Sequence, residues 1–273
     1  PPPPPHFQAE DGIRDSVNGL VGSEMCIRDR ADNATALVYR VLDPPSGDDL
    51  DEFRRFGEEH DVRIYLQTGG LDSVSLLHPD TEQEPLYYTL PEFDVRIEFE
   101  PVDFVQINDE INQAMVGSAL ELLEPEQEHR VLDLFCGIGN FSLPLARRCG
   151  ETLGVEGEAT LVRRAAANAA GNALSNATFR QADLAAIDGT EKWLQGPWDR
   201  VLLDPARSGA AEVVRHIGRM DPARIVYVSC HPGTLARDAG VLVNEAGYTL
   251  DAAGIIDMFP HTAHVESIAV FNK

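Results

Sequence analysis

The stretch VLDLFCGIGN, residues 131–140, decides the fold of this chain. Its first residues form a short apolar run typical of a buried strand, and this run leads into a glycine-rich turn. Gly137 and Gly139 allow the backbone to turn tightly and to approach a ligand. The turn has the form GxG rather than the full GxGxxG of dinucleotide-binding proteins, so an ordinary strand-to-helix turn is the alternative. The stretch predicts a cofactor loop of nucleotide-binding type.

Strands and helices alternate on the C-terminal side of this stretch. From residue 130 onward, the pattern predicts an α/β fold with a doubly wound parallel sheet. The expected strands are 131–134, 152–156, 177–180, 199–203, 224–229, 248–257 and 264–271, and the expected helices are 141–148, 158–172, 210–220 and 234–246. No helical pattern separates the last two strands, so we expect them to form a closing antiparallel pair.

The N-terminal side divides into two further parts. Residues 31–100 predict a small α+β subdomain, with strands at 35–41, 62–66, 73–77, 86–90 and 95–100 and a helix at 49–60. A helix at 109–123 links it to the second domain, residues 101–273. Residues 1–30 show neither a helical nor a strand period, and we expect them to be a non-native or disordered leader.

Composition limits the class of protein. A hydrophobic content of 43% suits a globular protein with a sizeable core. The sequence shows no transmembrane run and no signal peptide, so we expect a cytoplasmic protein without a membrane partner. Its 4 cysteines lack CxxC spacing, which favours a reducing compartment and argues against a structural metal site. The net charge of −23, taken alone, argues against a nucleic-acid partner.

Three acidic residues lie at the ends of successive predicted strands. Glu156 ends the second strand of the sheet, where a carboxylate can accept hydrogen bonds from ribose hydroxyls. Asp183 follows the third strand, where a residue that contacts adenine would lie, and Asp204 ends the fourth. Each alone is more often an N-cap or a solvated loop residue. Together with the glycine loop, they favour S-adenosylmethionine over a dinucleotide.

Two segments carry candidate chemistry. Cys230 follows the apolar run 224–228, so its thiol lies at the carboxyl end of a strand, where open α/β sheets bind ligands. This placement predicts a nucleophile, with a buried structural thiol as the alternative. The segment DMFPHTAHVES, residues 257–267, places two histidines and Glu266 between the last two strands. Its spacing fits no zinc motif, and Glu266 is a candidate general base.

Five separated motifs resemble those of the bacterial RNA uracil-5 methyltransferases, most closely the 23S rRNA enzymes that carry an iron–sulfur cluster. The motifs are DFVQIN (103–108), DLFCGIGNF (133–141), DPARSG (204–209), YVSCHPGTLARD (227–238) and DMFPHTAHVES (257–267). The resemblance extends from about residue 35 to residue 273 and implies a Rossmann-like class I methyltransferase domain over residues 101–273. It assigns S-adenosylmethionine binding to Gln106, Phe135, Asn140, Glu156, Asp183 and Asp204, beside the loop residues Gly137 and Gly139.

The same resemblance implies a reaction. Cys230 matches the nucleophile and Glu266 the general base of a transfer of a methyl group from S-adenosylmethionine to C5 of a uridine. Addition of the Cys230 thiolate to C6 would activate C5, and Glu266 would then remove the C5 proton. The thiolate calls for a lowered thiol pKa or a nearby base. The target base must also leave its stack.

The sequence departs from the family pattern in two ways. His231 stands where the family has Asn, and an imidazole there could donate a hydrogen bond, help to form the thiolate or crowd the pocket. Family members of this type also have an N-terminal RNA-binding β-barrel and a cysteine cluster for a [4Fe-4S] centre, upstream of the aligned region. Cys26, Cys136 and Cys149 lack the required spacing, so we expect neither a cluster nor another metal in this chain. Without the barrel, we expect weak RNA binding.

Several functions stay open at this point. The first is 23S rRNA uracil-C5 methylation by a monomeric protein, with tRNA as the alternative substrate. A remnant that binds S-adenosylmethionine without activity belongs to a different class. A dinucleotide oxidoreductase is disfavoured by the incomplete glycine pattern. An amino-group methyltransferase is disfavoured because the sequence DPAR at 204–207 lacks the aromatic residue of its polar clamp.

Overall fold

The structure, a computed structural model, describes residues 23–81, 83–258 and 265–273, and among these the side chains from Ala31 onward. The described residues form two compact units. One unit extends to Leu86 and includes Glu100–Val102, and the other comprises Tyr87–Phe99 and Asp103–Lys273. We describe each unit by itself.

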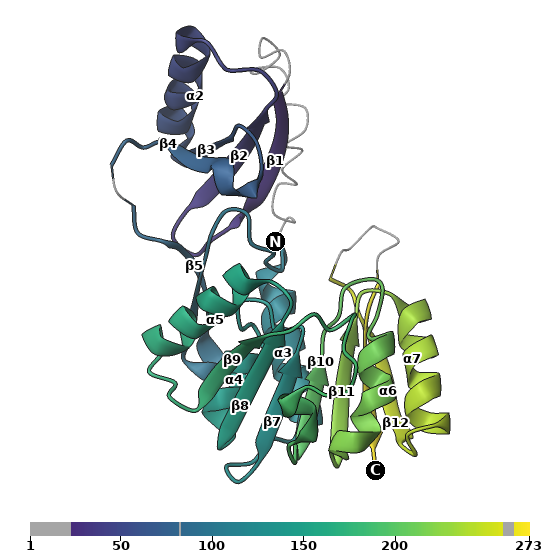
Figure 1. The fold of residues 1–273 in the computed structure, drawn as a ribbon. Coiled ribbons are helices and arrows are strands. Elements are labelled where there is room, and N and C mark those ends of the chain that lie inside the picture. Colours follow the sequence, from purple (N-terminus) through teal and green to yellow (C-terminus); the bar gives the residue numbers. More distant parts are fainter. Residues whose placement is uncertain (1–22, 82, 259–264) are drawn as a thin grey trace, which may run out of the picture. The chain divides into compact units, whose positions relative to one another are not determined.

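The first unit is a small α+β structure (Figure 1). Its four-stranded sheet has the order β1-β2-β3-β4, and helix α2 packs against β3 and β4. The bounds are β1 Ser23–Arg30, β2 Thr35–Val41, α2 Gly47–His60, β3 Val62–Gln67 and β4 Val74–His78. Helix α2 begins there because Ser46 and Asp49 form a capping box, which satisfies free N–H groups of the first turn.

Strand β1 differs from the sequence expectation. We expected no strand within residues 1–30, but Ser23–Arg30 pairs antiparallel with β2. The segment carries no clear apolar alternation, so its strand comes from backbone pairing with a strongly apolar neighbour rather than from its own pattern. Residues 1–22 lie outside the described part, and the proposed non-native origin of the leader stays a prediction.

The second unit contains a seven-stranded sheet in the order β12-β13-β11-β10-β7-β8-β9 (Figure 1). Its strands are β7 Arg130–Leu134, β8 Glu151–Glu156, β9 Ala177–Gln181, β10 Arg200–Leu203, β11 Arg224–Ser229, β12 Thr249–Ile256 and β13 Glu266–Asn272. Its helices are α3 Asp109–Leu123, α4 Ser142–Arg148, α5 Ala159–Gly171, α6 Ala211–Met220 and α7 Pro232–Asn244. The five neighbouring strands β11, β10, β7, β8 and β9 are parallel to one another. Strand β13 runs antiparallel to both β11 and β12. The predicted doubly wound sheet and its closing antiparallel pair are therefore confirmed.

The central strands β7, β10 and β11 are buried on both faces, which explains their near-continuous apolar sequences. Alternate residues of the central strands, among them Leu132, Leu203 and Tyr227, share one core cluster with residues of α6 and α7. These two helices pack against each other. Helix α3 packs against β10, β11 and β13. Among the described residues, no helix is long and apolar enough to span a membrane.

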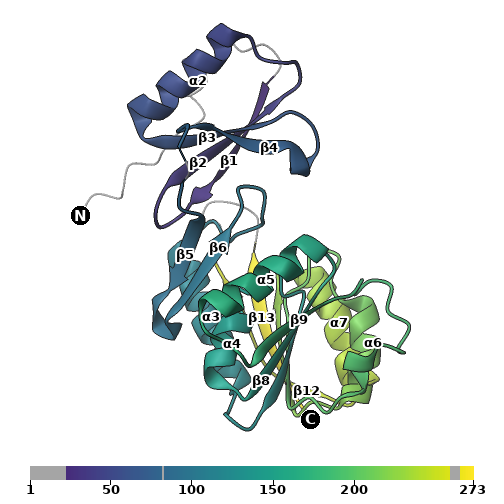
Figure 2. The same cartoon turned by 60° about the vertical axis from the view of Figure 1, so that its left-hand side comes forward.

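A two-stranded hairpin, β5 (Leu86–Leu90) and β6 (Val95–Phe99), lies beside α5 (Figure 2). Two asparagine side chains hold β6. The Asn168 amide accepts from the Glu98 N–H and donates to its carbonyl, both at 3.0 Å, and Asn172 bonds Arg96 in the same way at 2.9 and 2.6 Å. The hairpin therefore belongs to the second unit, so the boundary differs from the predicted division at residue 100.

Candidate active site

The predicted chemical groups gather along the carboxyl edge of the seven-stranded sheet. Phe135, Asp204 and Cys230 directly follow the parallel strands β7, β10 and β11, and Glu156 is the last residue of β8. Because parallel strands end at the same edge, these residues share one rim. Glu266 reaches this rim from the opposite direction, as the first residue of the antiparallel strand β13.

The glycine loop after β7 is tied to the end of β8. Phe135, Gly137 and Gly139 have φ angles of 67°, 54° and 102°, so the backbone turns through the left-handed region three times. The Gly137 N–H donates to Glu156 Oε2 at 3.1 Å. A Cβ added at Gly137 would meet no atom within 4 Å, whereas one at Gly139 would press on Leu143. Gly137 therefore leaves open space where a ligand can approach the backbone, and Gly139 is needed for packing.

Asn140, predicted to bind the cofactor, is engaged within the protein. Its amide exchanges two hydrogen bonds with the buried Asn112, at 2.9 and 3.1 Å, and its Oδ1 also accepts from the Tyr88 hydroxyl at 2.9 Å. These bonds connect the glycine loop to α3 and to β5. Asn140 therefore anchors the glycine loop, and its contact with the cofactor stays a prediction.

Two carboxyl groups near the rim are strongly desolvated. Asp133 is fully buried in β7, and burial raises its pKa to about 7 although Ser142 donates a hydrogen bond to it. Burial, together with Asp133 and Glu266, raises the pKa of Asp204 to about 8. Sequence reasoning missed Asp133, although a carboxyl in the middle of an apolar strand was the signal that could have revealed it.

Cys230 and Glu266 are brought together by the pairing of β11 with β13. Ser229 lies opposite Ser267, and the Ser267 hydroxyl donates to the Ser229 carbonyl at 3.1 Å. Continuing this register by one residue places Glu266 opposite Cys230. Glu266 is 6% exposed, and its burial raises its pKa. A carboxylate with a raised pKa is a better proton acceptor near neutral pH.

The Cys230 thiol is not activated by a lowered pKa. Burial, followed by Glu266 and Asp204, raises its pKa, and the positive charge of Arg207 acts in the opposite direction. The other route considered from the sequence, a nearby base, stays a prediction, with Glu266 as its candidate.

His231 caps helix α7. Its Nδ1 accepts a hydrogen bond from the Thr234 N–H at 3.2 Å, and Pro232 occupies the first turn. The helix therefore begins at residue 232 rather than at the predicted 234, since proline is favoured at a helix start and histidine here replaces the usual capping oxygen. The His231 ring is exposed.

The remaining predicted residues lie apart from this cluster. Asp183 is exposed after β9, and its Oδ1 accepts from the N–H of Ala185 at 3.0 Å in its own turn. Gln106 is half-buried in the segment between β6 and α3, which the 2.6 Å ion pair of Asp103 with Arg164 fastens to α5. Both residues stay predictions for the cofactor site.

Part of the predicted site cannot be placed. His261 and His264 lie outside the described residues, as does the side chain of Cys26. Among the described residues, Cys136 and Cys149 are buried, and no group of three or more His, Cys, Asp or Glu side chains is arranged to hold a metal ion.

The architecture of the second unit is that of class I S-adenosylmethionine-dependent methyltransferases. The structure is similar to that of a tRNA (uracil-54, C5)-methyltransferase from Pyrococcus abyssi in complex with S-adenosyl-L-homocysteine, with a TM-score of 0.71 and 25% identity over 95% of this chain and 65% of that chain. A likeness in fold alone is found to TYW2 of M. jannaschii in complex with AdoMet, with a TM-score of 0.56, 17% identity and coverage of 77% of this chain and 93% of that chain.

The sequence comparisons define the family. A family model described as tRNA (Uracil-5-)-methyltransferase matches residues 81–273, and the chain belongs to this family. It is 54% identical over 242 residues to the 23S rRNA (uracil(1939)-C(5))-methyltransferase RlmD of Stenotrophomonas maltophilia (strain K279a), covering 89% of this chain and 54% of that relative. The corresponding protein of Methylococcus capsulatus is 51% identical over 239 residues, covering 88% of this chain and 54% of that relative.

These findings confirm the resemblance inferred from the five motifs. The chain spans about half the length of the curated relatives that it matches. What those relatives act on is therefore carried to this chain only as a proposal.

Proposed function

We propose that this chain is the catalytic part of an enzyme that methylates C5 of a uridine in 23S rRNA. The observation that carries the proposal is the pairing of β11 with β13, which sets a thiol and a buried carboxyl side by side at the ligand-binding edge of a methyltransferase sheet. The two RlmD relatives, at 54% and 51% identity, support 23S rRNA as the substrate.

The rim suits S-adenosylmethionine, whose sulfonium and ammonium groups are cationic. Burial, Asp133 and Glu266 raise the pKa of Asp204, and a bound cation would relieve the repulsion of the Asp204 carboxylate by its acidic neighbours. The open space at Gly137 allows the ligand to approach the loop backbone, and the Glu156 carboxylate lies at its side. Phe135, Gly137, Gly139, Glu156 and Asp204 would thus hold the cofactor, with Gln106 and Asp183 assigned by family resemblance.

The cofactor would supply an electrophilic methyl group, and the protein would supply the nucleophile and the base. The Cys230 thiol transfers its proton to a base, for which Glu266 is placed, and the resulting thiolate adds to C6 of the uracil ring. The electron pair displaced from the C5–C6 double bond makes C5 nucleophilic, so that it can take the methyl group. S-adenosylhomocysteine would be released as the leaving group of the methyl transfer. Glu266 passes the proton taken from the thiol to solvent, and its carboxylate then removes the C5 proton, the double bond re-forms, and the C6–S bond breaks to restore the thiolate.

Methyl transfer to defined RNAs tests this proposal. With labelled S-adenosylmethionine, we expect label at C5 of uridine in a 23S rRNA fragment but little in tRNA. Glu266→Gln should lower this rate by about 10²–10⁴-fold, the usual contribution of a general base. As a control, Glu212→Gln breaks an exposed ion pair with Arg215 on α6 and should leave this rate unchanged.

A second substrate has an observation in its favour. The solved tRNA (uracil-54, C5)-methyltransferase shares 25% identity with this chain, and the family model carries a tRNA name. Label in tRNA rather than in the rRNA fragment would establish that alternative. Binding of the cofactor without label in either RNA would instead identify an inactive remnant.

A further inference from the structure

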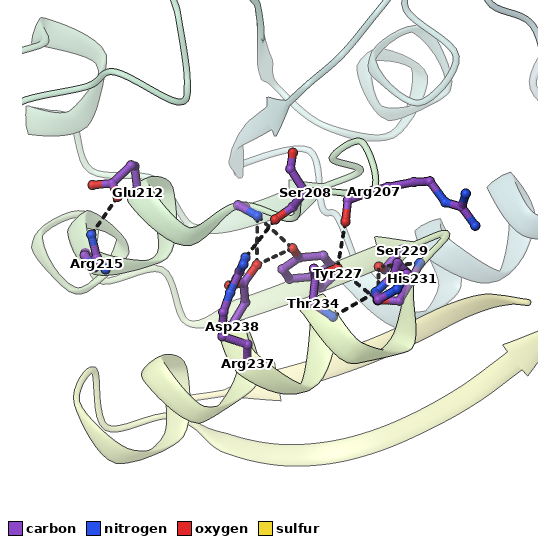
Figure 3. Close-up of polar contacts among 11 residues, drawn as sticks. Arg207, Ser208, Glu212, Arg215, Tyr227, Ser229, His231, Thr234, Arg237 and Asp238 are labelled. Carbon is purple, nitrogen blue, oxygen red and sulfur yellow. Dashed lines mark hydrogen bonds and ion pairs between the residues drawn. The ribbon is translucent and has the colours of Figure 1, made fainter.

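The loop 204–210, between β10 and α6, is fastened to β11 and α7 by four side chains. We call these four the clamp: Tyr227 on β11, and Thr234, Arg237 and Asp238 on α7 (Figure 3). The loop carries Asp204 and Arg207, and β11 and α7 flank Cys230. The clamp therefore joins the two segments that meet at the candidate thiol.

Asp238 is the centre of the clamp. It is fully buried, and its Oδ2 accepts from the Ala210 N–H and from the Tyr227 hydroxyl, both at 2.7 Å. The same Ala210 N–H lies 3.1 Å from the Tyr227 oxygen. The carboxylate thus holds the end of the loop to both β11 and α7 in a place where water cannot substitute for it.

Two further contacts hold the middle of the loop. Arg237 donates to Asp238 Oδ1 at 2.8 Å and to the Ser208 carbonyl at 2.9 Å, so it bridges the carboxylate and the loop backbone. The Thr234 hydroxyl lies 3.3 Å from the Arg207 carbonyl and 3.0 Å from the His231 carbonyl, so its one proton bridges the loop and the start of α7. The backbone on both sides of Gly209, which has a φ of 76°, is therefore fixed by side chains rather than by a strand or helix of its own.

Packing alone does not call for this arrangement, because it places the fully buried Asp238 carboxylate where an apolar side chain would pack as well, beside the half-exposed Arg237. Its bonds end on the backbone of residues 207, 208 and 210, directly beside the Arg207 side chain. We propose that Asp238 and its clamp partners are positioning residues, which hold the loop 204–210 against β11 and the start of α7, next to Cys230, and thereby set the reactivity of the Cys230 thiol.

The charges around the thiol give the clamp a measurable consequence. Among the described residues, the charged groups that act on Cys230 are Glu266 on β13 and Asp204 and Arg207 in the loop after β10. Arg207 is the one side chain of this set that lowers the pKa of the thiol. If the loop is displaced, the thiol loses the effect of the Arg207 charge. Burial and the nearby carboxyl groups then raise the pKa of Cys230 further.

The test is the pH dependence of Cys230 alkylation by iodoacetamide in the full chain, followed by mass spectrometry of the peptide that contains Cys230. We expect Asp238→Asn to move the midpoint upward by about half a pH unit, the effect of one unit charge at several ångströms in a solvated site. Removal of a negative charge would by itself move the midpoint downward, so the direction of the shift separates positioning from direct electrostatics.

Three further variants sharpen the test. Thr234→Val removes the anchor at Arg207 without disturbing a buried charge, so it should fold and shift the midpoint upward by a smaller amount. Arg207→Gln should shift the alkylation midpoint upward. The double variant Arg207→Gln/Asp238→Asn should show the same midpoint as Arg207→Gln alone. Glu212→Gln breaks an exposed pair with Arg215 on α6, away from the clamp, and should leave the midpoint unchanged (Figure 3).

An unchanged or lowered midpoint in folded Asp238→Asn, or an unchanged midpoint in Thr234→Val, would overturn the inference. Additive shifts in the double variant would also contradict it. The inference rests on the proposed function for the importance of Cys230, but alkylation needs neither RNA nor cofactor. Failure of the clamp would therefore appear in the alkylation profile, and failure of the proposed function would appear as absent methyl transfer.

Discussion

At the scale of single residues, the buried carboxyl groups near the rim determine how stability depends on pH. Asp133 and Asp204 have pKa values of about 7 and about 8, well above the value of about 4 for an unfolded aspartate. A raised carboxyl pKa gives stability that is fully present below the unfolded value and is lost as the pH rises through the folded value. We therefore expect the melting temperature of the cofactor-free protein to fall as the pH rises from about 4 to about 8.

Thermal unfolding of Asp204→Asn checks this expectation, because an amide cannot ionise. The variant should lose less stability than the parent over the same pH interval. Asp183→Asn, which changes an exposed carboxyl at the same edge, should follow the parent profile. Equal slopes for the parent and Asp204→Asn would show that Asp204 is not the group that titrates.

At the scale of secondary-structure elements, the start of α7 depends on His231. The Thr234 N–H donates to the His231 Nδ1, which takes the place of the capping oxygen. We expect His231→Ala to lower the free energy of unfolding by about 1 kcal/mol, the usual cost of a lost N-cap. His231→Asn, which restores the residue typical of the family, should keep the parent value.

Urea denaturation of both variants, monitored by circular dichroism, gives these values. Because the cap lies next to Cys230, the asparagine variant also serves as the control for any effect of the ring on the thiol. The capping role would be wrong if the alanine variant were as stable as the parent.

The sequence predicted most elements because their signals are local. The apolar runs of β7, β10 and β11 and the helical period of 109–123 needed no knowledge of distant contacts. The start of α7 was missed because it depends on a histidine cap. Strand β1 and the placement of the β5–β6 hairpin were missed because they depend on partners elsewhere in the chain, such as Asn168 and Asn172.

The same limit applies to the site. Cys230, Glu156 and Asp204 could be placed at the rim, since each ends or follows a parallel strand. The internal bonding of Asn140, the burial of Asp133 and the clamp around Asp238 could not be predicted, because each depends on which side chains meet across the sheet. Glu266 comes to lie opposite Cys230 because of the register between β11 and β13, which the sequence pattern does not reveal.

At the scale of the whole molecule, the net charge of −23 opposes RNA binding. We therefore propose that this chain alone binds RNA weakly, and that its chemistry is easiest to detect when the product stays attached to the protein. A substrate analogue that stays covalently bound to the protein after methyl transfer meets this condition, because the adduct accumulates even when RNA binding is weak.

The most direct test of Cys230 as the nucleophile is mass spectrometry of the protein after incubation with S-adenosylmethionine and a 23S rRNA fragment containing 5-fluorouridine. Fluorine at C5 cannot leave as the proton does, so the C6–S bond should persist after methyl transfer. We predict a methylated RNA adduct on the Cys230 peptide, its loss in Cys230→Ala and its retention in Cys149→Ala. A folded protein that binds the cofactor but forms no adduct, or forms one at another residue, would contradict the account.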